Sequence, residues 1–115
     1  MKALLSFFLA AFIAAPLLLA QDTSPVEATF KVYGNCGMCK KRIEKAVSVS
    51  DVKFAKWDKS TKMLAVAYIP AKITLDSLQQ RVAAVGHDTD RFKAPDSVYA
   101  SLPDCCLYRK GGNTH

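Results

Sequence analysis

The chain has 115 residues, of which 16 are Lys or Arg and 10 are Asp or Glu, giving a formal net charge of +6. A chain of this length leaves room for one small domain. The positive charge is modest, and its densest cluster, residues 40–45, has no interleaved aromatic residues that could stack on bases. The composition therefore argues against nucleic-acid binding.

Residues 1–20 have the pattern of a signal peptide. Lys2 supplies the positive start, residues 3–19 are almost entirely apolar, and a cleavage site fits between Ala20 and Gln21. An uncleaved membrane anchor is the less favoured alternative, because the stretch barely reaches the roughly 18 residues of a spanning helix. We therefore expect an exported protein, periplasmic or secreted, with no membrane segment after cleavage. Residues 21–25 would form a short linker.

The first predicted element after this linker is a half-buried strand. Apolar residues alternate with polar ones from Val26 to Val32, and Gly34 and Asn35 then end the strand. From Cys36 the apolar period changes to that of a helix running to about Ser48. Three lysines lie off its apolar face, toward water: Lys40, Lys41 and Lys45.

A hairpin and a second helix are expected next. Residues 52–57 and 63–69 are apolar runs separated by residues of turn composition, and Pro70 ends the second run. Thr74 is a good N-cap for a helix with apolar residues at helical spacing, and Gly86 is a good stop for it. Residues 87–93 are polar and charged, with Phe92 as the main apolar anchor, which suits an exposed edge strand.

The order strand, helix, strand, strand, helix, strand is that of an α+β ferredoxin-like βαββαβ sandwich. Two helices would cover one face of a four-stranded antiparallel sheet formed by residues 26–94. Residues 95–115 would be a C-terminal extension, with a frayed end from Arg109 onward.

Cys36 and Cys39 lie where the first strand turns into the first helix. Two thiols separated by two residues can bind one ion, and a helix start stabilises the thiolate, which is both the metal ligand and the redox nucleophile. Soft-metal binding and dithiol chemistry are therefore the two functions to separate.

With this motif in this loop, residues 26–93 resemble the heavy-metal-associated domain family of copper chaperones, metal-ATPase amino-terminal domains and periplasmic mercury-binding proteins. One departure from the family pattern Gly-Met-Thr-Cys-x-x-Cys matters most. Gly34 stands where the family has a Met that anchors the loop in the core. Met38, inside the motif, either replaces this anchor or is an exposed side chain.

Two thiolates with no adjacent carboxylate favour Cu(I), and Hg(II) is an alternative cargo. Zn(II) is less favoured because it prefers four ligands. The resemblance points the same way, since zinc-handling members of the family tend to have Asp where this chain has Asn35.

Three further residues are candidate additional ligands. The resemblance implies that His87 lies beside the cysteine motif, where a His could bind metal, donate to a thiolate or have no role. Cys105 and Cys106 are adjacent, and a disulfide between neighbours strains the backbone. The tail could fold back toward Cys36 and Cys39, form a second or intermolecular metal site, or hold a disulfide, and these interpretations stay open.

We expect a non-enzymatic carrier that transfers Cu(I) by thiolate exchange to a metal-transport or cuproprotein partner with an acidic surface. A periplasmic Hg(II) scavenger and a dithiol-disulfide oxidoreductase are the alternatives. A homodimer bridged by one ion is a further alternative that the sequence leaves open.

Overall fold

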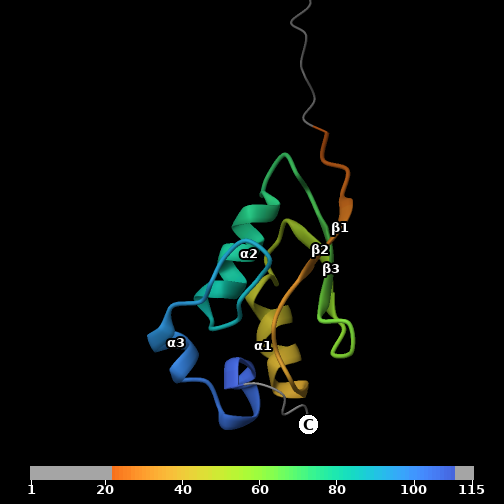
Figure 1. Ribbon diagram of the computed structural model, residues 1–115. Coiled ribbons are helices and arrows are strands. Elements are labelled where there is room, and N and C mark those ends of the chain that lie inside the picture. Colours follow the sequence, from red (N-terminus) through yellow and green to blue (C-terminus); the bar gives the residue numbers. More distant parts are fainter. Residues whose placement is uncertain (1–21, 111–115) are drawn as a thin grey trace, which may run out of the picture.

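The computed structural model describes residues 22–110, so the predicted signal peptide and the last five residues lie outside the described part. Figure 1 shows a sheet with two helices beside it and a tail that returns to the start of the first helix. Along the chain the elements are β1 (Val26–Lys31), α1 (Gly37–Ala46), β2 (Val52–Trp57), β3 (Met63–Tyr68), α2 (Leu75–Ala84), α3 (Asp96–Ala100) and the short 3-10 turns η1 (Asp104–Cys106) and η2 (Tyr108–Lys110).

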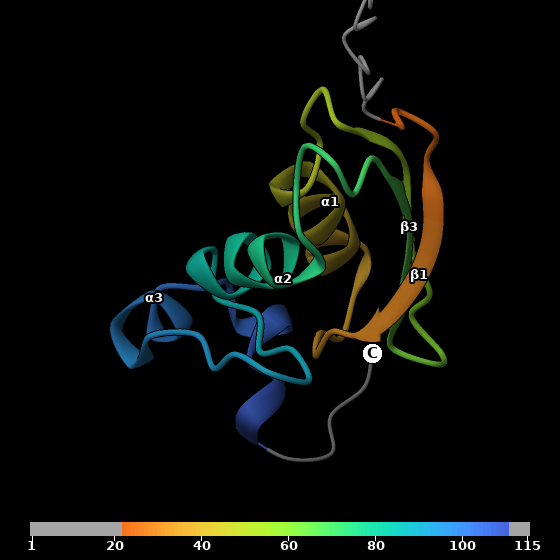
Figure 2. The ribbon, with the colours of Figure 1, turned by 90° about the horizontal axis from the view of Figure 1, so that it is seen from above.

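The sheet is antiparallel with the order β1-β3-β2. The predicted hairpin is present, with Trp57 opposite Leu64, and β3 then pairs with β1, with Leu64 opposite Phe30. Both α1 and α2 lie on one face of the sheet, as Figure 2 shows. The core between the layers is made by side chains that alternate along the strands and recur at helical spacing, chiefly Phe30, Ile43, Trp57, Leu64, Val66, Leu78 and Val82.

The predicted fourth strand at residues 87–93 is wrong. Within the described residues this segment contributes only an isolated bridge between Val32 and Thr89. The Thr89 N–H donates to the Phe92 carbonyl at 2.8 Å, which closes a turn, and the Asp90 carboxylate accepts the Lys31 N–H at 2.8 Å. Short polar side chains thus take over hydrogen bonds that a strand ladder would have used.

The helix ends follow the sequence signals. The Thr74 hydroxyl accepts the Ser77 N–H at 3.1 Å and caps α2, as expected. After α2, Gly86 has a φ of +110°, a left-handed conformation that favours glycine. The first helix ends at Ala46, about two residues before its predicted end.

The C-terminal extension packs on the domain, and Arg109 is not part of a frayed end. The Arg109 guanidinium makes two hydrogen bonds to the Asp88 carboxylate, at 2.6 and 3.0 Å, and one to the Ala94 carbonyl at 2.8 Å. Leu102 fills the space beside Gly86, so closely that a Cβ on Gly86 would lie 2.9 Å from it. The tail is therefore held by both polar and apolar contacts. No helix within residues 22–110 has the length and apolar character needed to cross a bilayer.

Candidate metal centre

The thiols of the motif lie at the start of α1. Cys36 is the N-cap residue, in extended backbone, and its side chain is half-buried, whereas Cys39 in the first turn is fully buried. Their Sγ atoms are 3.4 Å apart, and the Asn35 N–H donates to the Cys39 sulfur at 3.4 Å. A helix start next to a glycine-containing turn thus brings both sulfurs to one point.

The tail brings both of its cysteines to the same place. The Cys36 Sγ lies 3.3 Å from that of Cys105 and 3.4 Å from that of Cys106. The Sγ atoms of Cys36, Cys39 and Cys106 all lie within 4.8 Å of one another. All four cysteines are free thiols, so the tail holds no disulfide. The tail instead folds back onto Cys36 and Cys39, which is one of the three interpretations left open by the sequence.

The pKa values of Cys36, Cys105 and Cys106 are shifted in different directions. Burial opposes ionisation of Cys36, but hydrogen bonds from the Cys39 N–H and the neighbouring thiols outweigh it and lower the pKa of Cys36 to about 7. The contact with Cys36 raises the pKa of Cys105, and burial is the main cause of a raised pKa at Cys106. Cys36 is therefore about half ionised near pH 7.

Arg42 links the thiols to His87. Its Nη1 lies 3.3 Å from the Cys106 sulfur and 3.4 Å from Nε2 of His87. Because an arginine can only donate, Nε2 accepts, and the proton of the neutral ring is on Nδ1, which donates to the Tyr33 carbonyl at 2.7 Å. Burial, with the nearby Arg42 charge, lowers the pKa of His87 to about 4, although the Tyr33 carbonyl favours the charged ring.

His87 lies next to the thiol cluster, through Arg42, but is not one of its members. It is fully buried, both of its ring nitrogens have hydrogen-bond partners, and it does not belong to the thiol group. The structure gives no support to the expectation that it is an additional ligand. In the sequence, Arg42 is one of several basic residues of the helix, and the signal for its role is its position three residues after Cys39, on the same helix face.

The loop is anchored by Trp57. A Cβ on Gly34 would lie 3.2 Å from the Trp57 ring, so this ring fills the space beneath the loop. Trp57 is fully buried, and its Nε1 donates to the Val32 carbonyl at 3.0 Å. Met38 does not replace the anchor that the family pattern has at position 34, because its side chain is 52% exposed.

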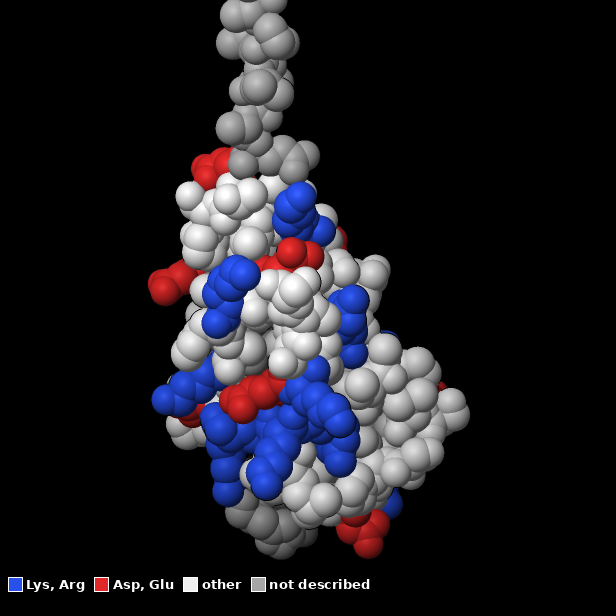
Figure 3. Space-filling view, turned by 180° about the vertical axis from the view of Figure 1, so that it is seen from behind, with Lys and Arg blue, Asp and Glu red and all other residues white. Residues whose placement is uncertain are grey.

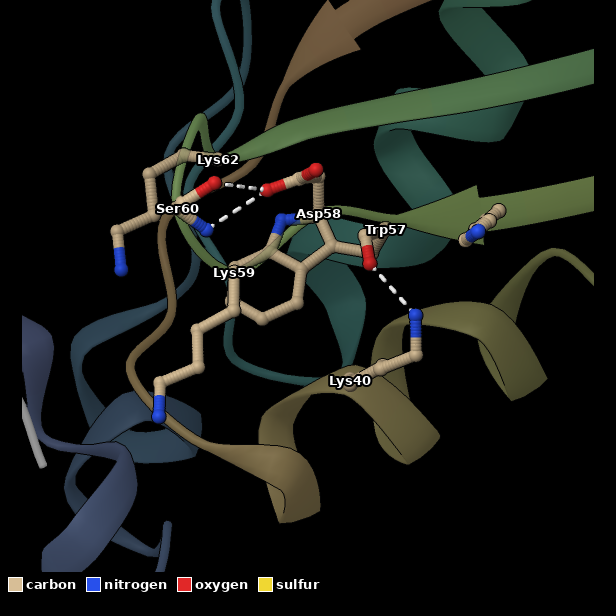
Figure 4. Close-up of a pocket in the computed structure, with 7 residues that line it drawn as sticks. Lys40, Trp57, Asp58, Lys59, Ser60 and Lys62 are labelled. Atoms are coloured by element: carbon tan, nitrogen blue, oxygen red, sulfur yellow. Dashed lines mark hydrogen bonds between the residues drawn. The ribbon is translucent and has the colours of Figure 1, made fainter.

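A basic surface adjoins the centre. Figure 3 shows Lys and Arg side chains gathered over the lower half of the face opposite to that of Figure 1. An open hollow beside α1 is lined by four lysines, and Figure 4 shows the Lys40 amino group donating to the Trp57 carbonyl, at 2.7 Å. Lys40 also forms an ion pair with Glu44 at 3.0 Å. Its amino group is therefore held by two partners, whereas the sequence predicted a lysine that points into water. The lysines of the hollow are Lys40, Lys56, Lys59 and Lys62.

Comparison with solved structures identifies the architecture. One similar structure is a CopZ metallochaperone, with 23% sequence identity, a TM-score of 0.53, and coverage of 56% of this chain and 98% of that one. Another is the N-terminal domain of a potential copper-translocating P-type ATPase from Bacillus subtilis in the Cu(I)-loaded state. It has 25% identity, a TM-score of 0.55, and coverage of 64% of this chain and 95% of that one.

This is the fold of a heavy-metal-associated domain. No family model matches the sequence, and no curated protein matches it. The similar structures are a metallochaperone and a metal-binding domain and not enzymes, in agreement with the expected non-enzymatic chain. The resemblance that the cysteine motif indicated is thus confirmed at the level of the fold.

The donor set of the centre is made of sulfur. Among the described residues, the group that could hold an ion contains Cys36, Cys39 and Cys106 and no carboxylate or imidazole. Thiolates are soft ligands, which bind Cu(I), Hg(II) and other thiophilic ions well and do not suit Mg²⁺ or Ca²⁺. The centre can therefore hold a soft ion.

Proposed function

We propose that this protein is an exported carrier of Cu(I), with Cys36 and Cys39 as its primary ligands. The observation that carries the proposal is the pair of free thiols whose sulfurs lie 3.4 Å apart at the start of α1. The Cu(I)-loaded state of the similar Bacillus subtilis domain supports the choice of ion. The signal-peptide pattern of residues 1–20 supports export to the periplasm or the exterior.

The ligand chemistry favours Cu(I) over the alternative ions. Two or three thiolates are enough to coordinate Cu(I), whereas Zn(II) in a structural protein site has four ligands. Asn35 precedes the motif, and its backbone N–H donates to the Cys39 sulfur. Its side chain is uncharged and so provides no carboxylate ligand for a divalent ion. Hg(II) fits the same sulfur set and is the second candidate cargo.

Transfer would proceed by exchange of thiolates. A thiolate of the partner forms a bond to the Cu(I) ion, and the bond from one cysteine of this protein then breaks, leaving that sulfur to take a proton from water. No electron moves, so the ion remains Cu(I) throughout. Cys36 is the accessible member of the primary pair, since Cys39 is fully buried, and the exchange would therefore begin on its side.

The test is a set of competition titrations on the reduced chain without residues 1–20. Cu(I), Hg(II) and Zn(II) are titrated against chelators of known affinity, with Cys36→Ser and Cys39→Ser as variants and the mass of the loaded protein recorded. We expect Cu(I) to bind as one ion per monomer, with large losses in both variants. Turnover of a disulfide substrate without tight metal binding would replace the carrier by the oxidoreductase. A loaded dimer would indicate an ion shared between two copies.

The basic surface suits a partner with an acidic docking face. Lys41 is exposed on α1, close to the motif, and it belongs to the basic cluster of that helix. Lys41→Glu should slow copper transfer to such a partner and weaken its dependence on salt, because rim charges act mainly on association rates. Arg81→Glu, an equal charge change at an exposed position of α2, is the matched control. Equal effects of the two changes would count against a specific acidic partner.

A further inference from the structure

The spacing of the thiol cluster is nearer to that of three ligands around one ion than to that of two ligands in line. With a metal–sulfur bond of about 2.3 Å, two thiolates on opposite sides of an ion are about 4.6 Å apart, whereas three in a plane are about 4.0 Å apart. The Cys36 sulfur lies only 3.4 Å from those of both Cys39 and Cys106. The cluster reaches the spacing of three ligands with a smaller expansion than that of two.

The two tail cysteines are placed differently. Cys106 is fully buried, belongs to the hydrophobic core cluster, and donates its N–H to the Pro103 carbonyl at 2.8 Å within η1. Cys105 is only partly buried, and its thiol contacts the sulfur of the exposed Met38 at 3.7 Å. Of this pair, only Cys106 shares the close group with Cys36 and Cys39.

The tail holds Cys106 at this place through contacts that do not involve the thiols. The Tyr108 hydroxyl donates to the Gly86 carbonyl at 2.6 Å and accepts the Asp88 N–H at 2.8 Å. Arg109 adds its paired hydrogen bonds to Asp88. These bonds fix the residues just after Cys106 to the turn that follows α2, so the third thiol is already positioned before any ion binds.

Charge around the cluster also favours a third thiolate. Three thiolates on Cu(I) carry a net charge of −2, which burial would penalise without a nearby cation. Arg42 is permanently charged and lies 3.3 Å from the Cys106 sulfur. His87 orients Arg42, because its Nε2 can only accept while Nδ1–H donates to the Tyr33 carbonyl.

We propose that Cys106 is the third ligand of a three-thiolate Cu(I) site, closed by the tail over the ion that Cys36 and Cys39 hold. This inference rests on the proposed function and adds a ligand from outside the part of the chain that resembles the family. Each thiol that binds gives up its proton to water, and no oxidation is involved. Cys105 is not a ligand of the resting site. Release then requires the Cys106–copper bond to break, so the tail slows the loss of the ion.

The experiment is X-ray absorption at the copper edge on the Cu(I)-loaded chain, which counts sulfur ligands. We expect three sulfurs in the wild type and in Cys105→Ser, and two in Cys106→Ser. Competition titration should show that the affinity of Cys106→Ser for Cu(I) is lower by about 10-fold or more. Loss of a residue that only hydrogen-bonds to a metal ligand already costs about 10-fold in affinity, and loss of a ligand should cost at least as much. Transfer from Cys106→Ser to a chelator should be faster. Cys105→Ser is the matched control, one residue away.

The outcomes separate the two proposals. Two sulfurs in the wild-type protein would overturn the three-thiolate site, whether or not Cys106→Ser folds, and tight Cu(I) binding lost in Cys36→Ser would leave the carrier function standing. Loss of the third sulfur in Cys105→Ser and not in Cys106→Ser would also overturn the assignment. Absence of tight Cu(I) binding in every form would instead refute the proposed function.

Discussion

Replacing Arg109 by Ala should release the tail while the rest of the domain stays folded. The Arg109 and Asp88 side chains are 21% and 19% exposed, and their charges meet at 2.6 Å. Breaking an exposed pair costs about 0–1 kcal/mol, and removing one partner of a fully buried pair costs about 3–5 kcal/mol. A pair that is about four-fifths buried lies between these limits, at about 2–3 kcal/mol. The population of the open tail should thus rise by about 30- to 150-fold.

Hydrogen exchange of the metal-free protein measures this opening. The reporters are two tail amides, those of Leu102 and Cys106, which donate to Tyr99 and Pro103. Both should exchange faster in Arg109→Ala by the stated factor, while amides of β3 are unchanged. The control is Arg91→Ala, whose ion pair with Asp76 is 65% and 43% exposed and should matter little. If the tail amides of Arg109→Ala exchange at rates within about threefold of those in the wild type, the Arg109–Asp88 pair does not hold the tail in place.

Three further changes test the loop, the buried imidazole and the second helix. Gly34→Ala should lower the free energy of unfolding by about 1 kcal/mol, because its Cβ would lie 3.2 Å from the Trp57 ring, whereas Gly37→Ala meets nothing within 4 Å and should be near neutral in the same urea titration. The lowered pKa of His87, about 4, favours the neutral ring in the fold, so this stabilisation is complete above pH 6.5 and is lost as pH falls toward 4. The metal-free protein should lose about 2–3 kcal/mol between pH 7 and 4.5, and this loss should shrink in His87→Gln; an equal loss would contradict the assignment. Thr74→Ala removes the cap of α2 and should cost about 1 kcal/mol in thermal unfolding, an expectation that an unchanged midpoint would contradict.

The parts of the fold that the sequence predicts well are those with a strong local pattern. The hairpin and both helices follow apolar periodicity, and the α2 cap follows from one Thr at the right position. The fourth strand fails because residues 87–93 have little apolar alternation. There the side chains of Asp88, Thr89 and Asp90 supply hydrogen bonds that hold a turn.

The thiol centre also has a part that a local sequence pattern predicts and a part that no local pattern predicts. The spacing of Cys36 and Cys39 predicts their convergence, because both lie at one helix start. The return of Cys106 is a contact between residues 70 positions apart, and no periodicity encodes it. Its signals are scattered through the chain: Arg109 needs Asp88, and Leu102 needs a residue without a side chain at position 86. These pairings become visible only when the chain is folded.

The close contact between Leu102 and Gly86 also gives a way to recognise related chains. A side chain at position 86 would collide with Leu102, and the φ of +110° there already disfavours any residue but glycine. A chain that docks such a tail must therefore keep glycine at position 86. A chain that has lost the tail can dispense with close packing at this turn, whereas a chain that keeps the turn glycine together with a Leu three residues before a vicinal cysteine pair has the means to dock such a tail. In an alignment, this linked pattern would mark out sequences with a covered thiol centre.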